Sequence, residues 1–82
     1  MILIQIEVPS LVRKYQFNLD ESVQVGTIIA EVVEVISQRE QCRLMGAVSE
    51  LSLCSREKEI ILDKGKSLNE QGIKKADTLI LL

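Results

Sequence analysis

Residues 23–36 read V-Q-V-G-T-I-I-A-E-V-V-E-V-I, and this stretch decides the fold. Its apolar side chains recur every three or four positions, which is the spacing of one face of an α-helix. The members of that face are Val25, Ile28, Ile29, Val32, Val33 and Ile36. Two acidic residues, Asp20 and Glu21, come just before and suit the positive end of a helix dipole. Because β-branched residues and Gly26 weaken an isolated helix, we predict one amphipathic helix held by packing.

The residues before this helix alternate between apolar and polar, which is typical of β-strands with one buried face. In the first strand the apolar positions are Ile2, Ile4, Ile6 and Val8, and in the second they are Tyr15, Phe17 and Leu19. Pro9-Ser10 separates the two, since proline cannot donate to a strand ladder and favours a turn. We predict an antiparallel hairpin with its loop near residues 9–12.

The segment after the helix is harder to interpret. Residues 38–50 allow either a helix that runs to Met45 and ends at Gly46 or a strand over residues 43–48. The alternation of Leu51-Ser52-Leu53-Cys54 predicts a third strand. A charged turn follows at residues 56–59, and Ile60-Ile61-Leu62 is then a short fourth strand.

The last part of the chain predicts one helical turn and a final strand. Ser67 and Glu70 have the spacing of a capping box, and Gly72 suits the left-handed conformation that ends a helical turn. Residues 78–82, T-L-I-L-L, are apolar on both faces and therefore indicate a central strand. We predict one domain, residues 1–82, of the α+β class, with a mixed sheet of four to five strands packed on one helix.

Composition excludes several classes of function. Ten basic and twelve acidic residues give a net charge of −2 and are mixed along the chain, so we expect no nucleic-acid binding. Histidine, the usual general base and a common metal ligand, is absent. No apolar run approaches the roughly 20 residues of a membrane span, and no leader pattern precedes the first strand. We expect a cytoplasmic protein that does not insert into membranes, with Cys42 and Cys54 reduced and structural.

No set of residues in the sequence predicts catalysis. Gly65-Lys66-Ser67 looks like the end of a phosphate-binding loop, but that motif needs glycine where Ile60 stands. The carboxylate pairs Glu31/Glu34 and Glu57/Glu59 belong to a polar helix face and a charged turn. We therefore expect no enzyme activity and no catalytic, cofactor-binding or metal-binding residues.

Two surfaces are candidates for binding a protein partner. One is the exposed sheet face, represented by Lys14, Gln16 and Ser52. The other is a helix edge formed by Ile28 and Val35, because Val35 widens the apolar arc beyond what a core requires. Edge strands and a small core also make a homodimer plausible.

The order of the predicted elements resembles the ubiquitin fold, or β-grasp, along the whole chain. Residues 67–79, S-L-N-E-Q-G-I-K-K-A-D-T-L, are similar to the pattern S-L-x-x-x-G-I-x-x-x-D-x-L of that superfamily. Residues 23–36 are similar to the helix V-P-V-G-x-L-I-x-x-L-V-x-x-I of the YukD/EsaB family, small bacterial proteins encoded with type VII (ESX/WXG100) secretion systems. Two positions depart from these patterns: Gln24 replaces a frequent proline and Ala76 a usual glycine.

The resemblance implies a non-enzymatic module that binds proteins, as an accessory or regulatory component of such a secretion system. It also implies partners among the membrane-anchored components of the machinery. A sulfur-carrier or conjugating protein is the alternative, but those act through a flexible Gly-Gly tail, whereas this sequence stops at Leu82 in the predicted last strand. A general β-grasp adaptor is a further alternative. A cofactor-binding domain like a ferredoxin is disfavoured, because its iron–sulfur cluster needs four ligands and the sequence has only two cysteines.

Overall fold

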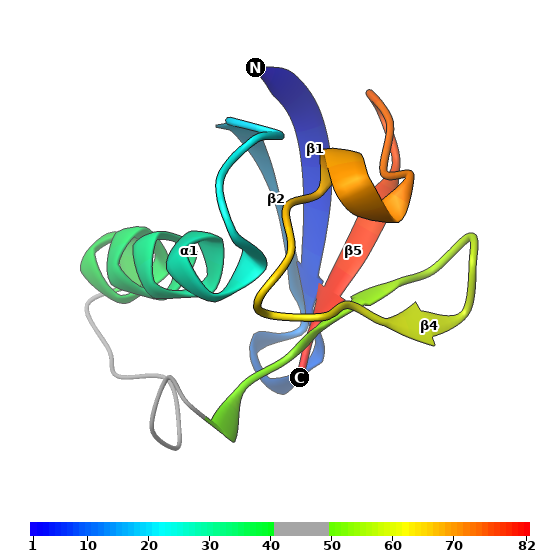
Figure 1. Ribbon diagram of the computed structural model, residues 1–82. Coiled ribbons are helices and arrows are strands. Elements are labelled where there is room, and N and C mark those ends of the chain that lie inside the picture. Colours follow the sequence, from blue (N-terminus) through cyan, green and yellow to red (C-terminus); the bar gives the residue numbers. More distant parts are fainter. Residues whose placement is uncertain (41–49) are drawn as a thin grey trace.

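The computed structural model describes residues 1–40 and 50–82, and it has one helix lying across a mixed sheet (Figure 1). The elements in the described ranges are β1 (Ile2–Val8), β2 (Arg13–Leu19), α1 (Val25–Glu40), β3 (Leu53–Ser55), β4 (Ile60–Ile61) and β5 (Thr78–Leu81), with 3₁₀ turns at Pro9–Leu11 and Asn69–Gln71. The predicted α+β, β-grasp class is confirmed. Of residues 38–50, for which the sequence allowed a helix or a strand, residues 38–40 belong to the helix, whereas residues 41–49, including Cys42, lie outside the described residues.

The sheet has five strands in the order β2-β1-β5-β3-β4. β1 pairs with β2 in antiparallel and with β5 in parallel orientation, while β3 is antiparallel to both of its neighbours. β5 is therefore the central strand, as its two apolar faces predicted. Beyond it, the backbone N–H and carbonyl of Leu82 pair with those of Ser52 at 2.9 Å each.

The core lies between the helix and one face of the sheet. The helix contributes Val25, Ile28, Ile29, Val32 and Ile36, all almost completely buried, and the sheet contributes Ile4, Ile6, Val8, Tyr15, Leu19, Leu53, Leu79 and Leu81. The predicted apolar stripe is thus confirmed, with Val33 half-buried at its margin. This packing supplies the stability that the sequence of the helix lacks by itself.

The last turn of the helix consists of polar residues. Its last residue, Glu40, is held by two side chains of the hairpin. The Tyr15 hydroxyl donates a 2.5 Å hydrogen bond to Oε1 of Glu40, and Nε of Arg13 lies 3.4 Å from the same oxygen. Both partners belong to β2. These contacts tie the end of the helix to the hairpin, over 25 residues of sequence in the case of Tyr15.

The third strand begins and ends later than predicted. The sequence favoured Leu51–Cys54, whereas β3 is Leu53–Ser55. Ser55 looks like a turn residue, but it is 1% exposed because its hydroxyl accepts the N–H of Lys58 at 3.2 Å. This local bond satisfies the serine and lets it occupy an inward position in the strand.

The predicted capping box is present before the second 3₁₀ turn. The Ser67 N–H donates to Oε1 of Glu70 at 3.0 Å, and the Glu70 N–H donates to Oγ of Ser67 at 3.2 Å. The bond from the Ser67 backbone is the main cause that lowers the pKa of Glu70 below its ordinary value. Gly72 closes the turn at a φ of 75°. Leu68 and Ile73 anchor it in the core.

Within residues 1–40 and 50–82, three residues other than glycine have a left-handed backbone: Val12, Glu59 and Ala76. Ala76, at a φ of 71°, occupies the position where glycine is usual in the superfamily pattern, and this conformation explains that preference. Val12 is the most unusual of the three, because a β-branched residue rarely adopts its φ of 53°. Its side chain is 91% exposed and so gains little from packing.

Replacing Val12 by asparagine is expected to raise the free energy of unfolding by about 1 kcal/mol, because asparagine tolerates the left-handed conformation. The gain would be measured from the midpoint of urea unfolding. Val12→Ala serves as the control, since alanine keeps most of the backbone cost and should gain less. An asparagine variant less stable than the wild type would contradict the strain at this position.

Candidate interaction surface

The outer face of the sheet, opposite the helix, carries one transverse row of side chains. The pairing registers place Lys14 beside Glu7, Glu7 beside Ile80, Ile80 beside Cys54, and Cys54 beside Ile61. Each of the five is exposed or half-buried. In β1, β5 and β3, the residues on either side of the row are buried on the core face, since side chains alternate between the two faces. The row crosses all five strands, and we call it the outer row.

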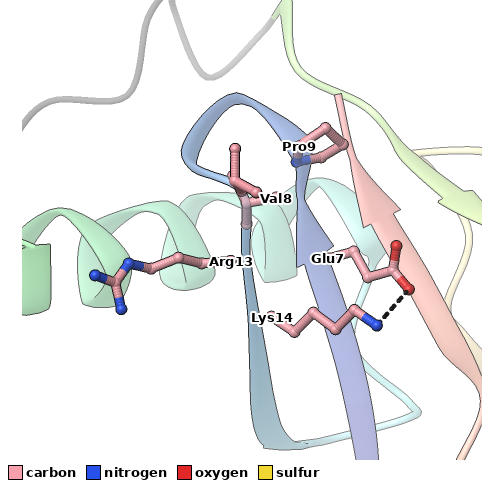
Figure 2. Close-up of a pocket in the computed structure, with 6 residues that line it drawn as sticks. Glu7, Val8, Pro9, Arg13 and Lys14 are labelled. Carbon is pink, nitrogen blue, oxygen red and sulfur yellow. Dashed lines mark ion pairs between the residues drawn. The ribbon is translucent and has the colours of Figure 1, made fainter.

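The first half of the outer row is charged. Oε1 of Glu7 accepts a 2.6 Å hydrogen bond from Nη1 of Arg56 and lies 3.9 Å from Nζ of Lys14. Figure 2 shows Lys14 directed toward Glu7, while Arg13 extends to the other side, toward the helix. The Glu7 carboxylate therefore sits between two cations, and this part of the face carries one positive charge in excess.

The second half of the outer row is apolar. Ile80 and Cys54 are half-buried, whereas Ile61 is 71% exposed and Ile60, beside it in β4, is 45% exposed. Together with Ser55, Arg56 and Glu59 these residues line a hollow of about 320 Å³. An apolar hollow beside paired charges suits an apolar side chain of a protein partner, with polar contacts at its rim.

A second hollow lies at the tip of the hairpin. It measures about 330 Å³ and is lined by Glu7, Val8, Pro9, Val12, Arg13 and Lys14 (Figure 2). Glu7 and Lys14 also belong to the outer row, so this hollow continues the charged end of the same face. The exposed Val12 gives it an apolar rim.

The structure groups only part of the predicted partner-binding residues. Lys14 and Gln16 are both exposed on β2 and point to the outer face with the row. Ser52 is half-buried next to β3, three strands away from them in the sheet order, and does not join them. The sequence did not identify Ile61 and Ile80, although the apolar character of both faces of residues 78–82 was a sign that an outer face would also be apolar.

The predicted helix edge is wrong for one of its two residues. Val35 is 37% exposed, but Ile28 is 1% exposed and belongs to the core. The first turn of the helix is held by the loop beside it, where the N–H groups of Val25 and Gly26 donate to the carbonyls of Lys66 and Lys64 at 2.9 and 3.0 Å. Ile28 follows directly after this covered turn and cannot reach a partner.

Metal sites and membrane-spanning helices are absent from the described part of the chain. Residues 1–40 and 50–82 contain no group of three or more His, Cys, Asp or Glu side chains placed to hold a metal ion. No helix in these ranges is long and apolar enough to cross a membrane. Every buried side-chain nitrogen or oxygen in them has a hydrogen-bond partner.

Comparison with known proteins shows the fold. No family model and no curated protein matches the sequence. Two solved structures similar to this chain are the ubiquitin-like domain of the Arabidopsis thaliana protein At2g32350 (TM-score 0.74, 17% identity, covering 99% of this chain and 74% of that one) and the N-terminal ubiquitin-like domain in the 4931431F19Rik protein (TM-score 0.71, 21% identity, covering 99% and 72%). The chain therefore has a ubiquitin-like fold.

Proposed function

Starting from the ubiquitin-like fold, we propose that this chain is a non-enzymatic module that binds proteins and serves a bacterial type VII secretion system as an accessory or regulatory component. Its partner is a cytosolic part of the membrane-anchored machinery, and its own location is the cytoplasm. The secretion assignment rests on the resemblance of residues 23–36 to the YukD/EsaB helix.

One observation carries the binding role, namely the outer row with its charged and apolar halves. A buried ionisable group poised for chemistry would favour catalysis. In the described residues the carboxyl groups with a lowered pKa are Asp20 and Glu70, which are exposed and bonded to neighbouring serines. By contrast, Ile61 is a large apolar side chain exposed beside a hollow, as in the centres of many protein interfaces.

The proposal is tested by titrating the chain against the cytosolic domain of a type VII membrane component encoded beside its gene. Ile61→Asp should weaken binding about tenfold or more, because a charge would replace the apolar anchor. Since Ile61 is 71% exposed in an edge strand, this variant should fold normally. A double variant Lys14→Ala/Gln16→Ala tests the polar part of the same face.

Lys75→Ala is the matched control, because it changes an exposed residue in the turn before β5. Intact binding in Lys14→Ala/Gln16→Ala would remove β2 from the contact, and intact binding in Ile61→Asp would remove the apolar half. Failure of the wild-type chain to bind any such component, together with neighbouring genes unrelated to secretion, would refute the assignment to this system.

A further inference from the structure

The long outer edge of the sheet is β2. It stands at one end of the strand order, and no other strand in the described ranges pairs with its far side. It contains seven residues and no proline, so its backbone is suited to accept another strand. The opposite edge strand, β4, has only two residues and follows Glu59 in a left-handed conformation, which limits pairing there.

The sequence of this edge is complementary to itself in one antiparallel register. If Phe17 faces Phe17 of a second copy, Tyr15 lies opposite Leu19 and Gln16 opposite Asn18. One step further, Lys14 lies opposite Asp20, so opposite charges meet at each end of the paired segment. The two-fold symmetry repeats every contact.

Neighbouring symmetric registers lack this complementarity. Centred on Gln16, the pairing would place Lys14 opposite Asn18, and centred on Tyr15 it would place Lys14 opposite Gln16. Centred on Asn18, it would place Asp20 opposite Gln16. In the first two registers Asp20 would face Val12 and Ser10, so none of the three brings a cation opposite Asp20. Because opposite charges in facing positions stabilise a strand pair, charge selects the register centred on Phe17.

An apolar groove lies beside the same point of the edge. It measures about 150 Å³, runs between β2 and α1, and is lined by Phe17, Asn18, Leu19, Glu31, Val32 and Val35. Phe17 is half-buried, with the guanidinium of Arg39 at 6.0 Å from its ring centre, and Val35 is 37% exposed. A second copy centred on Phe17 would bring two such grooves together across the symmetry axis and remove apolar surface from water.

We propose that this chain forms a two-fold symmetric dimer in which β2 pairs antiparallel with β2 of a second copy around Phe17, joining the two sheets into one. Lys14 and Asp20 form the intermolecular ion pairs. In the part of one copy that the structure describes, both residues have only weak or local partners: Nζ of Lys14 lies 3.9 Å from Glu7, and Oδ1 of Asp20 accepts the N–H and hydroxyl of Ser22. The proposal concerns the chain alone and does not depend on the secretion assignment.

Sedimentation velocity over protein concentrations from about 10 μM to 1 mM tests the dimer, and charge exchange tests its register. Lys14→Asp and Asp20→Lys should each raise the dissociation constant about tenfold, because two attractive pairs become repulsive. The double variant Lys14→Asp/Asp20→Lys should return to the wild-type value. An equimolar mixture of the two single variants should form mixed dimers, since each chain then meets its opposite charge.

Lys58→Asp is the control, because it changes the charge of an exposed residue between β3 and β4, on the side of the sheet opposite to β2, and it should leave the dissociation constant within a factor of two. Asp20→Lys also removes the hydrogen bonds from Ser22 to Asp20 within one copy, and thermal melting shows how much stability that loss costs. Lys14→Asp keeps these hydrogen bonds, so a weaker dimer in that variant reports on strand pairing alone. At about 1 M salt the difference between wild type and Lys14→Asp should shrink, because such salt screens charges beyond roughly 3 Å.

A wild-type chain that is monomeric at all these protein concentrations overturns the proposal. The free edge of β2 would then be available to a different protein. A dimer whose dissociation constant is the same in wild type and Lys14→Asp overturns it as well, because the copies would then meet elsewhere. Binding of a secretion component by a monomeric chain would support the proposed function and still exclude this dimer, so the two proposals fail separately.

Discussion

Leu79→Ala is expected to lower the free energy of unfolding by about 3 kcal/mol, one of the two largest effects predicted for this chain. Leu79 is 0% exposed in β5, and its strand lies between β1 and β3 at the centre of the sheet. The shortened side chain would leave a cavity that neighbours on both strands cannot easily fill. Urea unfolding followed by circular dichroism would measure the loss. It is a large share of the roughly 5–15 kcal/mol that stabilises a typical domain.

Ile80→Ala, one residue later, is the matched control. Its side chain is half-buried on the outer face, so its removal should cost about 1 kcal/mol or less. Equal losses of unfolding free energy in the two variants would mean that the faces of β5 are assigned wrongly. Ile80 would then not belong to the outer row.

Ile28→Ala should also cost about 3 kcal/mol, whereas Val35→Ala should be close to neutral. The two residues were predicted together as one helix edge, but Ile28 is 1% exposed and Val35 is 37% exposed. Removal of the exposed valine loses little packing, and alanine has the higher helix propensity, by about 0.5 kcal/mol. The same urea titration compares both variants with wild type.

A neutral Ile28→Ala would show that the start of the helix is loosely packed and would restore Ile28 as a candidate contact residue. A large loss in Val35→Ala would show that this side chain is already covered within one copy. The groove beside β2 would then be part of the core and would contribute nothing to a dimer.

Elements with local patterns were predictable from the sequence. The hairpin follows from alternation and Pro9, the helix from its apolar spacing, and the 3₁₀ turn from the Ser67 and Glu70 pair. In each case the deciding residues lie within a few positions of one another. The central position of β5 was also predictable, because its residues are apolar on both faces and such strands are typical of the middle of a sheet.

Features that depend on residues far apart in the sequence were not predictable. Glu40 on the helix meets Tyr15 and Arg13 of β2, which lie 25 or more positions earlier in the sequence. The charged half of the outer row exists because Glu7 meets Arg56, 49 positions later. Strand registers bring such pairs together, and alternation alone does not specify a register between distant strands.

The parallel pairing of β1 with β5 has a consequence for how the chain acquires its structure. Gln5 lies beside Thr78, and Ile6 beside Leu79, so the two middle strands come from opposite ends of the described chain. The chain loses the entropy of closing this long loop before the contacts between β1 and β5 stabilise it. Folding is therefore expected to be slower than that of helical bundles of similar size. During synthesis on the ribosome, the hairpin and helix emerge first, and the sheet is completed only when residues 78–81 follow.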